Sequence, residues 1–326
     1  MRVLILGGTR FTGPFVVDSL RELGHQVTVF HRGQGCNEPV TPEHLHGDIA
    51  SLMEHRDKFR ALEPDVVVHM CCLSEPQAAT FVEVFQGWAP KAVVISSADV
   101  YRSFGGLHRT ESAEPSLVPH DEYSPLREEL SVGGEGYNKT AVERIVMNRA
   151  ALPCTVLRYP AVYGPNDPQH RFHHFLKRMD DGRPAIPLPI PVAEWRFTHG
   201  YSENVAYATV LAVVMEEAVG KVYNVGDEHP PRLSEWVELI GKEAGWTGKV
   251  VVLPVERFPK GLLPDLDFRH DLVPSTQRIR RELGYEELVS RDEAMRRTIA
   301  WERANPPASM DLKDFDYESE DIALAE

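Results

Sequence analysis

The sequence has no long hydrophobic run, few cysteines and no excess of basic residues. Its 326 residues are 42% hydrophobic and 26% charged, a composition typical of one or two packed domains. The first apolar run, Val3 to Leu6, stops at a glycine after four residues, which is too short for a signal peptide or a membrane span. These absences predict a cytoplasmic protein without a membrane partner.

Neither cysteine chemistry nor metal binding is indicated. The segment 167–174 holds three histidines and an aspartate, but their spacing is not that of metal ligands, so we expect no metal. No C-x-x-C pair occurs, which predicts neither a disulfide framework nor a zinc site. The four cysteines, expected to be buried as small hydrophobic residues, are Cys36, Cys71, Cys72 and Cys154.

A net charge of −14 disfavours a polyanionic partner, because nucleic-acid binding usually needs a basic surface that displaces counterions. Much of this charge is terminal, since residues 310–326 hold seven acidic residues and one lysine, a net charge of −6. Residues 308–326 therefore form an acidic tail. It is either solvated and disordered or docked on the body or on a neighbouring subunit through its apolar residues Phe315, Tyr317, Ile322 and Leu324.

What the sequence does contain, at its start, is a strand, a glycine turn and a helix. The apolar run is followed by Gly-Gly-Thr-Arg-Phe-Thr-Gly at 7–13 and a helical segment at 14–23. Glycines let the backbone pass close to a pyrophosphate, whose negative charge the free N–H groups of the first helical turn face. The turn predicts a nucleotide cofactor, held by Gly7, Thr9, Arg10, Phe11, Thr12 and Gly13. Arg10 stands where a middle glycine is often found.

The second predicted strand, 26–30, ends at His31 and Arg32 rather than at an acidic residue. An acid there holds the ribose hydroxyls of NAD, whereas a basic residue can accept the 2′-phosphate of NADP. NADP is therefore favoured over NAD. The other interpretation of Arg32 is that it only begins a solvated loop. Asp48 is expected to bond the adenine amine, with Ile49 beside it.

Strands and helices alternate through the first half of the chain. Near-continuous apolar runs at 64–70 and 92–96 are typical of buried parallel strands. Helical segments at 77–88 and 137–149 and a strand at 154–158 complete the pattern. Residues 1–163 therefore predict an α/β fold, a Rossmann-like doubly wound parallel sheet.

From about residue 164 the pattern changes to proline-rich connections and interspersed helices. We expect residues 164–307 to form a smaller C-terminal α+β substrate lobe, partly interleaved with the first domain. The proline cluster at 184–191 predicts an ordered loop at the lobe junction. The predicted elements of this lobe are 202–217, 221–225, 233–244, 250–253, 276–283 and 292–305.

Six motifs stand in an order that resembles a known family. They are the glycine turn at 7–13, Ser-Ser-Ala-Asp-Val-Tyr at 96–101, Lys-Thr-Ala-Val-Glu at 139–143, Arg-Tyr-Pro-Ala-Val-Tyr-Gly-Pro at 158–165, Tyr-Ser-Glu-Asn-Val-Ala at 201–206 and Tyr-Asn-Val-Gly at 223–226. The chain resembles the extended short-chain dehydrogenases/reductases, specifically the NAD-dependent epimerase/dehydratase family. The resemblance implies a Rossmann domain with a substrate lobe, often acting on nucleotide sugars.

The resemblance also implies catalytic roles. In this family a serine or threonine bonds the reacting oxygen, a tyrosine exchanges its proton, and a lysine four residues later lowers the pKa of the tyrosine. Ser97 and Lys139 match the first and last roles. The tyrosine position holds Glu135, and the nearest tyrosine is Tyr137. Further residues that the resemblance places at the cofactor are Met70, Cys71, Ser96, Lys139 and Tyr159.

Three interpretations of the displaced tyrosine stay open. Residues two apart point to different sides of a regular helix, so Tyr137 needs a bend at the neighbouring glycines to reach the site. Alternatively, the usual acid–base group is absent, or the carboxylate of Asp99 or Glu135 replaces it. Ser97 as a strand-end cap and Lys139 as a solvated helix lysine are plainer interpretations, but their position behind a phosphate loop favours function.

For the substrate, the resemblance implies arginines in the second lobe that contact a diphosphate, and Arg196 and Arg269 lie in roughly these places. The guanidinium fork matches phosphate oxygens, although a surface salt bridge is the competing explanation.

The sequence as a whole predicts an NAD(P)-dependent oxidoreductase or isomerase of epimerase/dehydratase type, acting on a nucleotide-sugar-like substrate by transient hydride transfer. The alternatives are a catalytically silent NAD(P)-binding sensor or scaffold and, less favoured by the acidic charge, an RNA-binding relative. The sequence leaves the oligomeric state open, and a homodimer is one of the states it allows.

Overall fold

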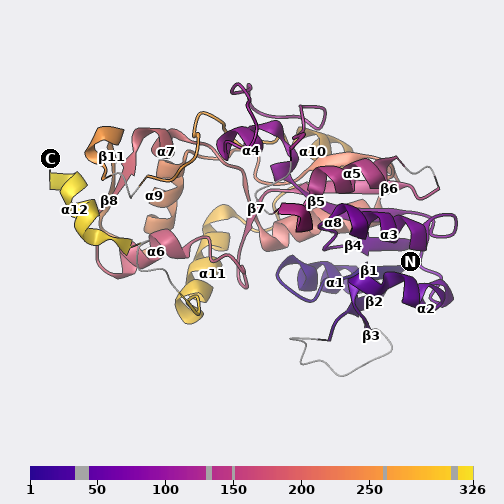
Figure 1. Cartoon of the computed structure of the whole chain (residues 1–326). Helices are drawn as coiled ribbons and strands as arrows, with labels where there is room; N and C mark the ends of the chain where they lie inside the picture. Colours follow the sequence, from indigo (N-terminus) through magenta and orange to yellow (C-terminus); the bar gives the residue numbers. More distant parts are fainter. Residues whose placement is uncertain (34–43, 130–133, 149–150, 260–262, 310–314, 326) are drawn as a thin grey trace.

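The computed structural model describes residues 1–33, 44–129, 134–148, 151–259, 263–309 and 315–325, except for the side chain of Glu135. The chain forms a doubly wound sheet domain and a smaller lobe at one end of it (Figure 1). Cys36 lies outside the described residues, and the other three cysteines are free thiols. Among the described helices, none combines the length and hydrophobicity that a membrane crossing needs.

The main sheet has seven strands in the order β10-β6-β5-β4-β1-β2-β3, and every neighbouring pair is parallel. Its strands are β1 (Arg2–Leu6), β2 (Gln26–His31), β3 (His44–His46), β4 (Val66–His69), β5 (Ala92–Ser97), β6 (Cys154–Tyr159) and β10 (Val222–Asn224). The order of these strands and their parallel direction confirm the Rossmann-like doubly wound fold that the alternating sequence pattern predicts.

Both faces of this sheet are covered, because successive strand residues point to opposite sides. In β1, Val3 and Ile5 join one core cluster, whereas Leu4 and Leu6 join the other. Helices α1 (Thr12–Glu22) and α8 (Ser202–Val214) pack side by side on the first face. Helices α3 (Glu75–Phe85) and α5 (Lys139–Met147) pack together on the second.

Three elements predicted for the second lobe belong to the sheet domain instead. Helix α8 is apolar and buried nearly all round, so it needs cover from both the sheet and the neighbouring helices. Strand β10 extends the sheet by pairing with β6, and α10 (Gln277–Leu283) adds Ile279 and Leu283 to the same core cluster as α8. The assignment of 202–217, 221–225 and 276–283 to the lobe was therefore wrong.

The smaller lobe packs around Tyr163, Phe172 and Trp236. The proline cluster does not form a loop but a strand and a helix start, β8 (Ala185–Pro189) and α7 (Ile190–Glu194). Among the strands that the structure describes, β8 pairs only with β11 (Lys249–Leu253). Proline is tolerated there because each strand of this two-stranded sheet is an edge strand. The other elements of the smaller lobe are β7 (Ala161–Tyr163), β9 (His199–Tyr201), α6 (His173–Asp180), α9 (Leu233–Ala244) and α11 (Arg291–Ala304).

Short helices lie between the elements described so far. They are η1 (Ile49–His55), α2 (Arg56–Ala61), η2 (Ala98–Val100), α4 (Arg102–Leu107), η3 (Gly134–Gly136), η4 (Glu216–Ala218) and η5 (Val255–Arg257).

The acidic tail docks on the body of its own chain. Its helix α12 (Tyr317–Ala325) lies beside α6 and β8 at the far end of the lobe (Figure 1). Glu320 forms a buried ion pair with Arg178, at 2.7 Å, and the hydroxyl of Tyr317 donates to Asp181. Ala323 is fully buried. For residues 315–325, docking is thus the alternative that the structure supports.

Candidate active site

The glycine turn after β1 has the geometry that a close approach to a phosphate needs. Gly7 and Gly8 adopt φ values of +89° and +85°, and Phe11, the residue before α1, has a φ of +53°. A Cβ at Gly13 would lie 2.3 Å from the carbonyl carbon of Gly8. The first turn of α1 therefore crosses directly over the turn backbone, which only glycine permits.

A cavity of about 400 Å³ opens at the carboxyl ends of β1, β2, β3 and β4. Ligands of open parallel sheets bind at this edge. Ten of the residues predicted to bind the cofactor line it: Gly7, Thr9, Arg10, Thr12, His31, Arg32, Asp48, Ile49, Met70 and Cys71. The sequence analysis missed four others, Gly8, Gly47, Leu73 and Gln77, although Gly8 belongs to the glycine turn itself.

Five predicted cofactor residues do not line this cavity. Phe11 and Gly13 shape the turn from behind. The hydroxyl of Ser96 donates to Glu143 at 2.6 Å, and the buried hydroxyl of Tyr159 bonds Thr209. Lys139 is buried, and its Nζ atom donates to the carbonyl oxygen of Ile95 in β5. The hydroxyl groups of Ser96 and Tyr159 are thus satisfied inside the protein, and their cofactor roles stay predictions.

His31 and Arg32 face different environments. The Nδ1 atom of buried His31 accepts the N–H of Gly33 at 3.1 Å, so its proton lies on Nε2, 3.0 Å from Nδ1 of His44. The His31 ring thus bonds His44 of the neighbouring strand β3. Arg32 is exposed at the cavity margin, so the positive charge at the end of β2 comes from Arg32.

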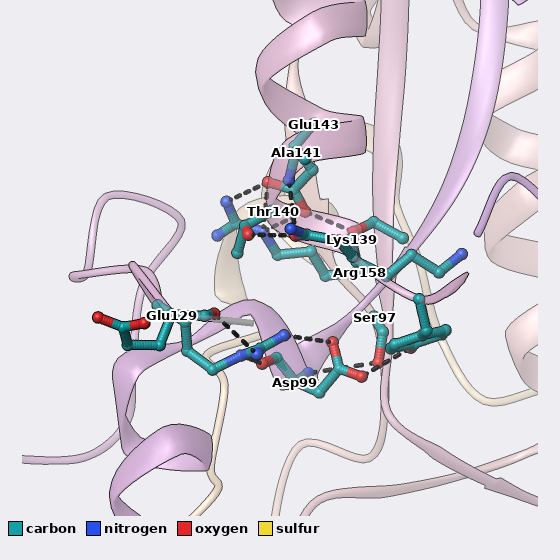
Figure 2. A network of polar contacts seen from close by, with 12 residues as sticks. Ser97, Asp99, Glu129, Lys139, Thr140, Ala141, Glu143 and Arg158 are labelled. Atoms are coloured by element: carbon teal, nitrogen blue, oxygen red, sulfur yellow. Dashed lines mark hydrogen bonds and ion pairs between the residues drawn. The ribbon is translucent and has the colours of Figure 1, made fainter. Parts of the chain in front are cut away.

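Tyr137, Asp99 and Ser97 meet at the carboxyl end of β5. The hydroxyl of Tyr137 donates to Oδ2 of Asp99 at 2.6 Å and also shares a side-chain hydrogen bond with Ser97. The Ser97 hydroxyl accepts the N–H of Asp99 at 3.3 Å, and Figure 2 shows these two residues side by side. Two of the alternatives for the displaced tyrosine, Tyr137 and Asp99, are thus one hydrogen-bonded pair. The side chain of Glu135 lies outside the described residues.

Tyr137 reaches the site because it precedes the helix. Helix α5 begins at Lys139, and Asn138 caps it by accepting the N–H of Ala141 at 3.0 Å. The predicted helix start at 137 was two residues early, and the rule for residues two apart in a helix does not apply to Tyr137. The capping asparagine is a sequence signal that marks this boundary.

Burial controls the protonation of the pair. It raises the pKa of the Asp99 carboxyl, against the hydrogen bond from Tyr137 and the charge of Arg127, which lower it. Burial and the neighbouring Asp99 charge also raise the pKa of Tyr137. The expected lowering of this pKa by Lys139 stays a prediction. Tyr137 carries its proton, and Asp99 is positioned to accept it.

Lys139 is buried rather than solvated. Its Nζ atom donates to the carbonyl oxygens of Cys72 and Ile95, both at 2.8 Å, and lies 5.9 Å from the centre of the Tyr137 ring. Burial lowers the pKa of its ammonium group. The lysine thus ties the ends of β4 and β5 together directly beneath Tyr137.

Two arginines missed by the sequence analysis support the site. Arg127 donates through Nε to the carbonyl oxygen of Asp99 and lies 3.8 Å from Oδ1 of the same residue. Arg158 of β6 holds Glu143 of α5 in a buried ion pair at 2.7 Å (Figure 2). Arg127 lies in the connection between α4 and η3, where no sequence pattern pointed to it. Arg158 stood in a motif but without an assigned role.

The two arginines predicted to bind substrate are each paired with an acid. Arg196 pairs with Asp271, and Arg269 pairs with Asp267, both at 2.6 Å. The salt bridge named as the competing explanation is therefore present at both positions.

Among the described residues, no group of three or more His, Cys, Asp or Glu side chains is arranged to hold a metal ion. Of the segment 167–174, His170 pairs with Glu302.

The comparison with known families agrees with this geometry. A model of the NAD dependent epimerase/dehydratase family matches residues 3–226, from β1 to just beyond β10. The chain belongs to this family. It is thus an extended short-chain dehydrogenase/reductase, and the matched range includes the glycine turn, Ser97, Tyr137 and Lys139.

Relatives of known structure share the fold over most of their length. The UDP-glucose 4-epimerase of Thermotoga maritima, solved with UDP-glucose, has a TM-score of 0.70 at 21% identity, covering 94% of this chain and 100% of the other. The Bordetella bronchiseptica enzyme WbmG, solved with NAD, has a TM-score of 0.71 at 18% identity, covering 94% of each chain. Human sterol-4-alpha-carboxylate 3-dehydrogenase, decarboxylating, is 23% identical over 362 residues, covering 91% of this chain and 87% of that protein.

Proposed function

We propose that this family member is an NAD(P)-dependent enzyme of epimerase/dehydratase type that acts on a nucleotide-sugar-like substrate by transient hydride transfer. The observation that carries this proposal is the 2.6 Å hydrogen bond between Tyr137 and Asp99 at the carboxyl end of β5. This pair supports an acid–base role for Tyr137, although its spacing to Lys139 differs from that of the family.

The residues of the first cavity fit a dinucleotide. The turn backbone leaves no room for a Cβ at Gly13, which is typical of a pyrophosphate cradle, and the cavity continues to the ends of β2 and β3. Gly7 to Thr12 would hold the pyrophosphate, and Arg32 and Asp48 the adenosine end. When bound, the nicotinamide would supply the hydride acceptor and donor.

The acid–base pair works as a short relay. When a substrate hydroxyl is oxidised, its proton moves to the Tyr137 oxygen while the Tyr137 proton moves to Oδ2 of Asp99. In the reverse direction Tyr137 protonates the carbonyl oxygen and recovers its own proton from Asp99. Ser97 orients the reacting oxygen, and Lys139 and Arg127 hold the pair in place from below and beside it.

The test is turnover of the full chain over a panel of nucleotide sugars with NAD and NADP, followed by nicotinamide absorbance and product analysis. We expect oxidation, dehydration or isomerisation of at least one sugar. Cofactor binding without change of any sugar would favour the sensor instead. Retention of RNA stem-loops that weakens with salt would favour the RNA-binding alternative.

We further propose that NADP is the preferred cofactor, because Arg32 is the exposed cation at the end of β2. NADPH should bind more tightly than NADH. Replacing Arg32 by Ala removes one charge-assisted contact, worth roughly 1.5–3 kcal/mol, and should narrow the preference about tenfold or more. Calorimetry measures both affinities. Arg10→Ala is the matched control, since it should weaken both cofactors alike. Equal affinities in the parent protein would contradict the preference.

A further inference from the structure

A second cavity, of about 450 Å³, lies in the smaller lobe, apart from the glycine turn. Side chains from β8, α7 and α9 make most of its wall together with Phe258, Leu263, Pro264 and Phe268. Eleven of the fourteen lining residues are apolar. The three polar ones are His174, Arg178 and Glu320. Glu320 comes from α12, so the acidic tail is part of the wall.

These three polar residues together leave the cavity uncharged. Arg178 and Glu320 are 5% and 4% exposed and pair with each other at 2.7 Å. Arg178 also donates to the carbonyl oxygen of His174 at 2.7 Å and stacks on Phe315 of the tail. Burial, followed by the charge of Arg178, lowers the pKa of His174 to about 4, so its ring is neutral at pH 7. The donors of Arg178 are thus occupied by the protein.

The second oxygen of the Glu320 carboxylate faces another arginine. Oε1 accepts from Arg178, whereas buried Oε2 has no hydrogen-bond partner and lies 3.8 Å from Nε of Arg183. The Glu320 carboxylate thus lies between two arginines, and its charge is compensated inside the protein. Without the charge of Glu320, the cavity wall would carry the uncompensated charge of Arg178.

We propose that α12 is a wall of a ligand cavity and that Glu320 makes this cavity select an uncharged apolar ring over an anionic group. The cavity would receive an uncharged aromatic or similarly apolar part of the substrate. Phosphates are excluded from it because Arg178 is neutralised from within. The assignment of this ligand to the substrate rests on the proposed function. The selection between uncharged and anionic groups is independent of that function.

Two dyes with one ring system test the selection. N-phenyl-1-naphthylamine is uncharged, and 1-anilinonaphthalene-8-sulfonate carries the same rings with a sulfonate. By fluorescence titration of the full chain, the parent should bind the uncharged dye in preference. Glu320→Gln leaves Arg178 unneutralised and should raise the relative affinity for the sulfonate roughly tenfold, the effect of one charge-assisted hydrogen bond. The double variant Arg178→Gln/Glu320→Gln should return the ratio to that of the parent.

Two further variants locate the effect. Glu318→Gln makes the same charge change at an exposed position of α12 and should leave the ratio unchanged. Val192→Trp fills the cavity and should abolish binding of both dyes. An unchanged ratio in Glu320→Gln, an equal change in Glu318→Gln, or undiminished dye binding in Val192→Trp would each overturn the inference. Because no cofactor or turnover is needed, an inactive protein that selects between the dyes would refute only the proposed function.

Discussion

Replacing Tyr137 by Phe should lower turnover by roughly a hundredfold or more while cofactor affinity stays the same. The substitution removes the hydroxyl that donates to Asp99 and keeps the ring above Lys139. The measurement is kcat on the best substrate of the panel, with cofactor affinity determined in parallel. Tyr123→Phe is the matched control, because Tyr123 is 82% exposed and should show no effect.

Asp99→Asn should cause a loss of similar size, because the relay needs both members. Since burial raises the pKa of Asp99, activity in the parent should rise with pH through a range above that of an ordinary carboxyl group, as Asp99 loses its proton. The Asn variant should lack this acidic limb of the pH profile.

Other outcomes would assign the chemistry elsewhere. If Asp99→Asn or Glu135→Gln loses activity while Tyr137→Phe is nearly silent, a carboxylate acts without the tyrosine. If the parent and all three variants share one residual rate across the panel, the enzyme lacks the proposed mechanism, and a cofactor-binding sensor explains the protein better.

Replacing Gly13 by Val should abolish the increase in Tm that NAD or NADP produces. Even a Cβ at this position would lie 2.3–2.4 Å from three backbone atoms of Gly8, so the turn and α1 must separate where the pyrophosphate would bind. Thermal unfolding with and without cofactor measures the effect. Gly13→Ala, which adds the Cβ alone, provides a milder variant if the valine does not fold.

Gly24→Ala serves as the control in the same helix region. A Cβ at Gly24 meets no atom within 4 Å, but its φ of +81° makes the substitution unfavourable, by roughly 1–2 kcal/mol. This variant should be less stable and still respond fully to cofactor. A folded Gly13→Val protein whose Tm rises with cofactor as in the parent would show that the glycine turn does not hold the pyrophosphate.

The sheet domain could be predicted as far as its local patterns reach. The apolar runs of β4 and β5 and the glycine turn after β1 each carry their own signal, because parallel strands buried on both faces and a close backbone crossing restrict the residues allowed. Strand β10 and helix α8 were misassigned, since their sequences fit a strand and a helix in either lobe. Their place depends on pairing with β6 and packing on α1, contacts between residues far apart in the chain.

The features of the site also divide into those that the sequence determines and those that depend on the tertiary structure. The sequence by itself determined which residue types stand at the ends of β1, β2 and β5, because the strand ends of a parallel sheet meet at one edge whatever the loops do. Only the tertiary structure decided that Tyr137 bonds Asp99, that Arg196 and Arg269 are paired with acids, and that the tail supplies Glu320 to a cavity. The physical reason is that an ion pair or hydrogen bond depends on which side chains meet in space, and spacing along the chain fixes this only within a single helix or strand.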